Sequence, residues 1–148
     1  MTWKVYLSGE IHSNWRQQII DGSSANNLPI AFTSAVTNHE ASDAAGDLLG
    51  AEQDAFWRDH KSSKVNAIRT KTHLQDCDIA IIRFGEKFKQ WNAAFDAGYA
   101  SALGKSLIVI HSEEHQHALK EVDAAALAVV DDAQKVVEIF RYVMEGKL

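Results

Sequence analysis

The chain has 148 residues and a formal net charge of −5, from 15 basic and 20 acidic residues. A chain of this length usually folds as one unit, so we expect a single domain over residues 1–148. Its 46% apolar and 24% charged residues are typical of globular proteins and exclude a disordered chain, a collagen or a coiled coil. Because the balance is acidic, the sequence offers no basic stripe for a nucleic-acid polymer, and we exclude that class of partner.

The cysteine content and the apolar runs bear on the cellular compartment. The single cysteine, Cys77, excludes an internal disulfide, which agrees with a reducing environment. The first residues are too mixed in character for the apolar core of a signal peptide. No apolar run approaches the roughly 20 residues that are needed to cross a bilayer. We therefore expect a cytoplasmic protein without a membrane partner.

Short aliphatic runs alternate with longer helical patterns along the chain. The predicted strands are residues 3–8, 30–33, 79–84, 106–110 and 127–130. The first predicted helix follows Ser13, and the others cover residues 64–74, 91–103, 113–125 and 133–145. Strands that are apolar on both faces and alternate with helices indicate a parallel sheet with right-handed crossovers. The sequence therefore predicts an α/β fold, a flavodoxin-like doubly wound five-stranded sheet of order 2-1-3-4-5 in three α/β/α layers.

Two segments lack a regular pattern. Residues 21–27 have the composition of a loop, rich in Ser, Asn and Gly. Residues 34–63 show no clean period, and the only proline, Pro29, lies before them, so no rigid residue braces this stretch. Loops of this length in small domains usually have a function or are mobile. We expect residues 34–63 to form a mobile lid that reaches the ligand site.

The predicted topology indicates where a ligand binds. In open parallel sheets, ligands lie beyond the carboxyl ends of the strands, where the strand order reverses. The candidate residues in the loops at that edge are Ser8, Gly9, Glu10, His12, His39, Gly85, Glu86, Trp91 and Asn92. The helix before the third strand adds Arg69 and Lys71, which face either a phosphate or the solvent, and of the two we select Arg69 as a functional residue. A polar rim with aromatic side chains suits a small molecule.

Three activities that are common on this fold do not match the loops. A phosphate-binding loop or a dinucleotide fingerprint needs closely spaced glycines after the first strand, where only Gly9 is present. A phosphate-accepting receiver needs an aspartate at the end of the third strand, where Arg83 and Phe84 stand. An FMN-binding loop needs small hydroxyl residues, and Glu10 and His12 would lie badly beside a phosphate.

Asp96 is a candidate for chemistry because it lies in the first two turns of a helix that follows a ligand loop. The helix dipole there favours the ionised carboxylate by about 0.3–1 kcal/mol. Asn92 lies one turn earlier, so both side chains share a face. Such an acid is suited to act as a nucleophile or a proton acceptor, and the alternative is a capping or solvated aspartate.

The seven histidines raise the question of a metal site. His111, His115 and His117 cluster after the fourth strand, but the spacing suits a loop rather than one helix face. With a single cysteine and no zinc-protease motif, we predict neither a metal nor a cofactor.

Several motifs surround Asp96 and the first strand. The matching elements are Asp96-x-Gly98-Tyr99-Ala100, Gly104-Lys105, Tyr6-Leu7-Ser8-Gly9, and Asp78 before the third strand. With these motifs the sequence resembles the nucleoside 2-deoxyribosyltransferase superfamily. More closely, it resembles the YtoQ family, a branch of that superfamily, over nearly the whole chain. The segments that carry this closer resemblance are residues 6–13, 38–39, 69–71, 84–87 and 90–92.

The resemblance implies a single nucleoside 2-deoxyribosyltransferase-like domain with a carboxylate nucleophile. In the superfamily, a glutamate attacks the anomeric carbon of a deoxyribonucleoside and releases the base. By position, Asp96 is the nucleophile here, and Tyr6 would hold it through a hydrogen bond. Glu10, His12 or Glu86 would supply the proton. The implied substrate contacts are the rim residues together with Arg69 and Tyr99, with Trp91 suited to stack on a base or sugar.

The same comparison leaves the activity open between alternatives. The acid is an aspartate rather than a glutamate, and Gln90 stands where the transferases place an aspartate. We predict a transferase or hydrolase that acts on the N-glycosidic bond of a nucleoside or nucleotide. The alternative is a non-catalytic module that binds a nucleotide-derived metabolite. Superfamily members commonly oligomerise, so the resemblance also implies a homo-oligomer, dimeric or larger.

Overall fold

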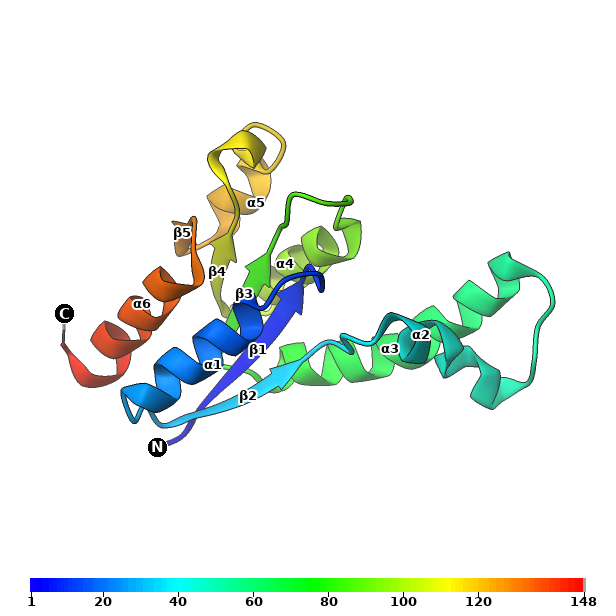
Figure 1. Cartoon of the computed structure of the whole chain (residues 1–148), viewed down its shortest axis with the longest axis horizontal. Helices are drawn as coiled ribbons and strands as arrows, with labels where there is room; N and C mark the ends of the chain where they lie inside the picture. The colour runs from blue at the N-terminus through cyan, green and yellow to red at the C-terminus, as the bar shows by residue number, and fades with distance from the viewer. Residues whose placement is uncertain (148) are drawn as a thin grey trace.

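The computed structural model describes residues 1–147 and contains one sheet of five parallel strands (Figure 1). The strands are β1 (Trp3–Gly9), β2 (Ile30–Ser34), β3 (Ile79–Arg83), β4 (Ser106–Ile110) and β5 (Ala128–Val130). Their order is β2-β1-β3-β4-β5, so the predicted flavodoxin-like topology is confirmed. The predicted strands agree with the observed ones to within one residue at each end.

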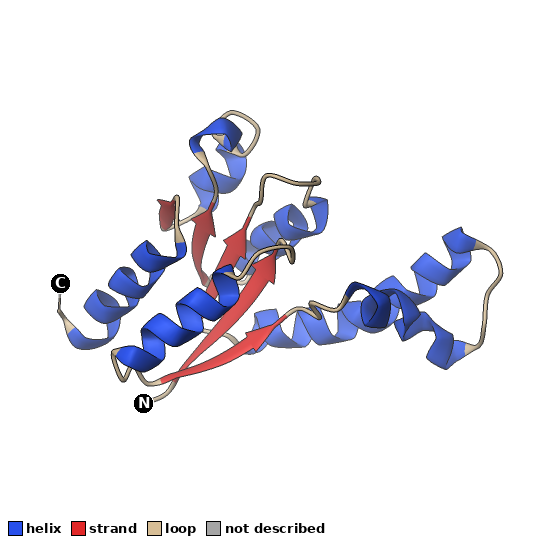
Figure 2. Ribbon diagram, in the orientation of Figure 1, coloured by secondary structure: helices blue, strands red, loops and turns tan. Residues whose placement is uncertain are grey.

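Helices cover both faces of the sheet and complete three layers (Figure 2). The α-helices are α1 (Trp15–Ala25), α2 (His39–Ala44), α3 (Ala55–Asp76), α4 (Trp91–Ala102), α5 (Lys120–Ala125) and α6 (Ala133–Glu145). The two short 3-10 helices are η1 (Ala45–Leu49) and η2 (Glu113–His115). No helix within residues 1–147 is long and apolar enough to cross a membrane.

The alternation of side chains along β1 divides the core into two halves. Val5 and Leu7 face α1 and α6, where they pack with Trp15 and Phe140. Tyr6 faces the opposite side, where the small residues Ala93, Ala97 and Ala100 let α4 lie close to the sheet. Because side chains two residues apart on a strand share a face, Ser8 points to the same side as Tyr6. The strand therefore directs the Ser8 hydroxyl toward α4.

Two predicted boundaries differ from the structure. Residues 21–27 were expected to be a loop, but α1 continues to Ala25. Gly22 lies against Val137 of α6, and Ser23 is buried, so packing between the two helices outweighs the low helix propensity of these residues. The predicted helix over 113–125 is two elements, η2 and α5, separated by a turn.

The expectation that residues 34–63 lack regular secondary structure is wrong, and the helix predicted over 64–74 already begins at Ala55. This segment contains α2, η1 and the first part of α3, which together form an arm that projects from the sheet (Figure 1). Asp54 caps α3 by accepting hydrogen bonds from the backbone of Phe56 and Trp57. Ser62 then joins the two sides of the arm, because its hydroxyl accepts from the Gly46 amide and donates to the Asp43 carbonyl. Caps and polar contacts rather than an apolar stripe hold this arm together.

Candidate active site

A cleft of about 860 Å³ opens beyond the carboxyl end of the sheet. It is lined by the end of β1, by α2 and α3, and by the start of α4. The predicted site residues that line it are Ser8, Gly9, Glu10, His12, His39, Arg69, Trp91, Asn92, Asp96 and Tyr99. Gly85 and Glu86 line a smaller pocket next to it, and Tyr6 lies buried beneath the surface.

Asp96 is a buried carboxylate at the side of the cleft. Its side chain is on the sheet-facing side of α4, and the residue is 8% exposed. The Ser8 hydroxyl donates a hydrogen bond of 2.5 Å to Asp96 Oδ2. Burial raises the pKa of Asp96 above the usual range of an aspartate, and the hydrogen bond from Ser8 opposes this shift. A carboxylate with so little solvation is a stronger base and nucleophile than one in water.

The predicted hydrogen bond from Tyr6 to Asp96 is wrong. The Tyr6 hydroxyl is buried and has no hydrogen-bond partner within the described residues. Ser8 makes the contact instead because it shares the face of Tyr6 and lies two residues closer to the carboxyl edge, where α4 begins. Burial, with the negative charge of Asp96 adding to it, raises the pKa of Tyr6 to about 12. The phenol is therefore a neutral donor beneath the cleft.

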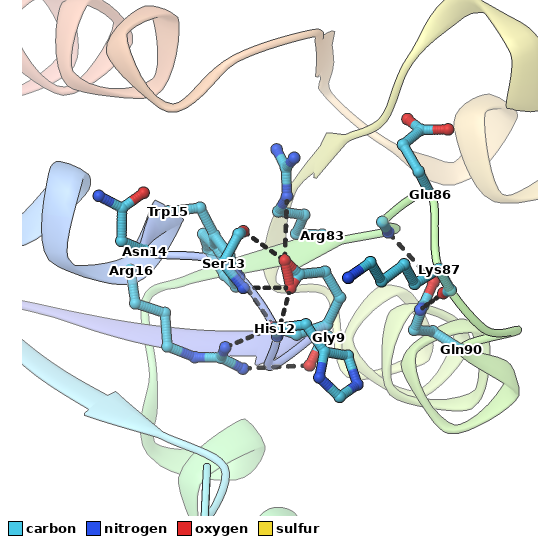
Figure 3. A network of polar contacts seen from close by, with 12 residues as sticks. Gly9, His12, Ser13, Asn14, Trp15, Arg16, Arg83, Glu86, Lys87 and Gln90 are labelled. Atoms are coloured by element: carbon cyan, nitrogen blue, oxygen red, sulfur yellow. Dashed lines mark hydrogen bonds and ion pairs between the residues drawn. The ribbon is translucent and has the colours of Figure 1, made fainter.

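Glu10 shapes the loop between β1 and α1. Its carboxylate accepts hydrogen bonds from the backbone of His12 at 2.9 Å and of Ser13 at 3.2 Å, and from the Ser13 hydroxyl (Figure 3). Burial acts to raise the pKa of Glu10, but these donors and the charge of Arg83 outweigh it, so the pKa is lowered. An ionised carboxylate that is committed to three donors is a poor proton donor. This geometry contradicts the predicted catalytic role of Glu10.

Arg16, which no sequence motif singles out, fixes the same loop. Its terminal nitrogens donate to the carbonyls of Glu10 at 2.6 Å and Gly9 at 3.2 Å (Figure 3). Its Nε donates to Ser34 Oγ at 3.0 Å. Gly9 has a φ of 113°, and a Cβ there would collide with the carbonyl of Arg83. The ends of β1 and β2 are thus tied together beside Asp96.

The loop between β3 and α4 is held by the side chain of Gln90. Its amide oxygen accepts from the Gly85 backbone at 3.1 Å, and its amide nitrogen donates to the carbonyls of Lys87 and Phe88 at 3.0 and 2.8 Å. A carboxylate at position 90 would accept the first bond but could not donate the other two. Phe88 has a φ of 55°, and the centroid of its ring lies 4.9 Å from the centroid of the His12 ring. The strain of a bulky residue in this conformation is thus located at the cleft.

The two long walls of the cleft differ in chemistry. The α4 wall is aromatic, with Trp91 75% exposed, Phe95 67% exposed and Tyr99 stacked on Phe95. The α3 wall is polar, and there Arg69 donates to the Ser34 carbonyl at 3.2 Å. Flat rings stack well on exposed aromatic side chains. The arrangement suits a ligand that has an aromatic ring on one side and polar groups on the other.

Gly98, in the motif that contains Asp96, lies on the outer side of α4. Apart from its chain neighbours and the backbone of α4, no atom of residues 1–147 lies within 4 Å of the position that a Cβ would occupy there. No packing contact among the described residues therefore requires a glycine at this position.

The histidines after β4 are held by local contacts. His111 Nε2 lies 2.9 Å from Asp123 Oδ1, and His115 Nε2 lies 3.1 Å from the Gly85 carbonyl. Across residues 1–147, no three histidine, cysteine, aspartate or glutamate side chains are grouped to hold a metal ion.

Comparison with known proteins shows the relationship that the residues suggested. Residues 6–144 match the model of the family described as nucleoside 2-deoxyribosyltransferase YtoQ. The chain belongs to this family. It is 41% identical to the protein YtoQ of Bacillus subtilis (strain 168) over 146 residues, which cover 98% of this chain and 99% of that protein. The Bacillus protein is described as uncharacterized, so the YtoQ family relationship brings no assigned activity.

Two solved structures share the fold of this YtoQ family member. A conserved protein from Enterococcus faecalis V583 superposes with a TM-score of 0.64 and 14% identity, over 97% of this chain and 99% of that chain. A 2-deoxyribosyltransferase from Bacillus psychrosaccharolyticus superposes with a TM-score of 0.51 and 17% identity, over 90% of each chain. At these identities the likeness concerns the fold.

Proposed function

We propose that this protein breaks the N-glycosidic bond of a nucleoside or nucleotide, with the Asp96 carboxylate as the nucleophile. The observation that carries the proposal is the position of Asp96. It is a buried carboxylate with a raised pKa, held by Ser8 at the side of a large cleft with an aromatic wall. Membership of a family described by 2-deoxyribosyl transfer supports the same chemistry.

In the proposed reaction, Asp96 attacks the anomeric carbon while the bond from that carbon to the base nitrogen breaks. The electron pair of this bond leaves with the base, which takes up a proton. His12 is the best-placed donor among the three predicted ones, because Glu10 is ionised and Glu86 lies in the smaller pocket. Water or a second base then attacks the same carbon and releases Asp96, giving hydrolysis or transfer.

A base-release assay tests this proposal. Wild type, Asp96→Ala and the control Asp21→Ala, an exposed aspartate of α1, are incubated with deoxyribonucleosides, ribonucleosides and their 5′-monophosphates. We expect base release by wild type and the control, and a loss on the order of 10³-fold or more in Asp96→Ala. Equal release by all three proteins, or by none, would contradict the proposal. A second free base added to the reaction separates transfer from hydrolysis, since only transfer yields a new nucleoside.

The second candidate is a module that binds a nucleotide-derived metabolite without turnover. The commitment of Glu10 to its loop favours this alternative, because it removes one proton donor from the cleft. A thermal-shift screen with product analysis distinguishes the two. A ligand at 100 times its Kd adds about 2.7 kcal/mol of stability whether or not it is consumed. A shift with intact ligand after long incubation supports the binding module.

We also propose that the protein acts in the cytoplasm as a homo-oligomer. The Cys77 thiol is free and buried, as is usual in a reducing compartment. Burial raises the pKa of Cys77, so little of the reactive thiolate is present at neutral pH. The exposed apolar residues of the arm support the association of copies, as argued in the Discussion.

A further inference from the structure

A second pocket, of about 180 Å³, opens beside the cleft between the loops that follow β1 and β3. It is lined by Glu10, His12, Ser13, Arg83, Gly85, Glu86 and Lys87. Glu10 and His12 also line the cleft, so one ligand can reach both spaces. The pocket lies between β1 and β3, where the order of the sheet reverses and where doubly wound folds bind their ligands.

The pocket contains two cationic side chains with donors that make no hydrogen bond within the described residues. Arg83 Nε is buried without a hydrogen-bond partner in residues 1–147, and its only contact with a carboxylate there is a long ion pair of 3.8 Å with Glu10. In Figure 3 the terminal nitrogens of Arg83 point away from the carboxylate that a dashed line joins to Nε. Lys87 is exposed and forms no ion pair in the described part of the chain. Unused donors of this kind favour an anionic acceptor.

The acids of the pocket already have partners. Glu10 accepts from Ser13 and from the backbone of His12, and Glu86 Oε2 lies 3.5 Å from His115 Nε2. A Glu10 carboxylate without partners would disfavour a phosphate at this position. The structure shows instead a carboxylate whose oxygens are occupied, which leaves the donors of Arg83 and Lys87 to a ligand.

We propose that this pocket binds the phosphoryl group of a phosphorylated nucleoside whose base and sugar occupy the cleft. The identity of the base and sugar rests on the proposed function. The planar fork of an arginine matches the oxygens of a phosphoryl group, and a lysine adds a second charge. Helix α1 begins next to the pocket without a side-chain cap or an acid in its first turn, so its positive end adds to the same potential. The favoured substrate is therefore a nucleotide rather than a nucleoside.

Calorimetric titration tests the subsite independently of turnover. The probes are 2′-deoxynucleosides, their 5′-monophosphates and inorganic phosphate, titrated into wild type, Arg83→Gln, Lys87→Ala and the control Lys120→Ala. Lys87→Ala removes an exposed side chain, so it does not threaten the fold, and Lys120 is an exposed lysine outside both pockets. We expect at least one monophosphate to bind about tenfold or more tightly than its nucleoside. Both pocket variants should lose that advantage, and the control should keep it.

The results of the titration and of the base-release assay test the phosphoryl subsite and the proposed glycosidase activity separately. Equal binding of nucleosides and monophosphates overturns the subsite and leaves the proposed function standing. Tight, Arg83-dependent binding of a monophosphate without base release supports the subsite and contradicts the glycosidase. Arg83-dependent binding of inorganic phosphate that is no weaker than that of any monophosphate overturns the nucleotide assignment. Failure of every phosphorylated probe to bind overturns the subsite.

Discussion

Asp96 links the stability of the protein to pH. Its pKa is raised in the folded state, so between the unfolded pKa, about 3.9, and the folded pKa the native protein binds more protons than the unfolded chain. Stability falls as pH rises through this window, and the full cost of the buried charge is present at neutral pH. We expect Asp96→Asn, which still accepts from Ser8, to melt at a higher temperature than wild type at pH 7.

Thermal melts between pH 3 and pH 7 check this expectation. The advantage of Asp96→Asn should shrink as pH falls from the folded pKa toward about 4 and should be absent below that pH, because the aspartate is then neutral in the folded and the unfolded state. An Asn variant that is less stable than wild type at pH 7 would show that the ionised carboxylate stabilises the fold.

Ser8 tunes the ionisation of Asp96. Its hydroxyl donates to the carboxylate, so Ser8→Ala removes a bond that favours the charged form. We expect the acid limb of the rate profile to move to higher pH and kcat/KM near neutral pH to fall about tenfold. The matched control is Ser23→Ala, a buried serine of α1 whose hydroxyl has no partner within the described residues. An unshifted acid limb in Ser8→Ala would contradict this role.

At the scale of single elements, Gln90 determines the shape of the loop between β3 and α4. Gln90→Glu keeps the acceptor for Gly85 but loses both donors to the carbonyls of Lys87 and Phe88. We expect faster amide hydrogen exchange across residues 85–90 and an activity loss of about tenfold or more, since small misplacements near a reacting group are costly. Hydrogen-exchange mass spectrometry checks the loop, with β3 as the internal reference. Unchanged exchange would mean that the loop is held by its strained backbone alone.

The sequence predicts the strands well because each is a short run rich in apolar residues, and the central strands β3 and β4 are buried along most of their length. It fails over residues 34–63 for a physical reason. The arm packs only against itself and leaves much of its surface in solvent, so no apolar period marks its helices. Its stability depends on the local Asp54 cap and on the contacts of Ser62, whose partners Gly46 and Asp43 are distant along the chain.

At the same scale, the topological rule located the candidate site but not the roles within it. The predicted strand order places Ser8, Glu10 and Asp96 at one edge of the sheet, where the structure has them. The role of Tyr6 depends on how deeply its side chain is buried, and the role of Glu10 depends on the donors around its carboxylate. The spacing of residues along the sequence shows neither the burial nor the donors. Arg16 was missed for the same reason, since its partners are backbone carbonyls on two separate loops.

At the scale of the whole molecule, the arm exposes apolar side chains that its own chain does not cover. Leu48 is 83% exposed, Leu49 61%, Phe56 66% and Trp57 53%, all near the end that projects from the sheet (Figure 1). Large apolar side chains exposed on one segment favour association with a partner surface. We expect a second copy of the chain to cover it.

Light scattering after size-exclusion chromatography measures the mass of the assembly. We expect a dimer or larger species for wild type and a shift toward the monomer for Leu49→Glu, because burying an unpaired charge in an interface is costly. Leu127→Glu, at a leucine that is 76% exposed and lies away from the arm, should leave the mass unchanged. A wild-type monomer would contradict the prediction.

A substitution at Gly98 tests whether a substrate or a neighbouring subunit contacts α4. Glycine in a helix interior destabilises the helix by about 1 kcal/mol relative to alanine. At position 98 there is space for the methyl group of an alanine. Gly98→Ala should therefore raise the melting temperature of the isolated protomer. If the same substitution lowers activity or breaks the assembly, then a substrate or a neighbouring subunit rests against the bare backbone at that point. The Gly98→Ala variant thus distinguishes a glycine that nothing contacts from one that a substrate or a neighbouring subunit packs against.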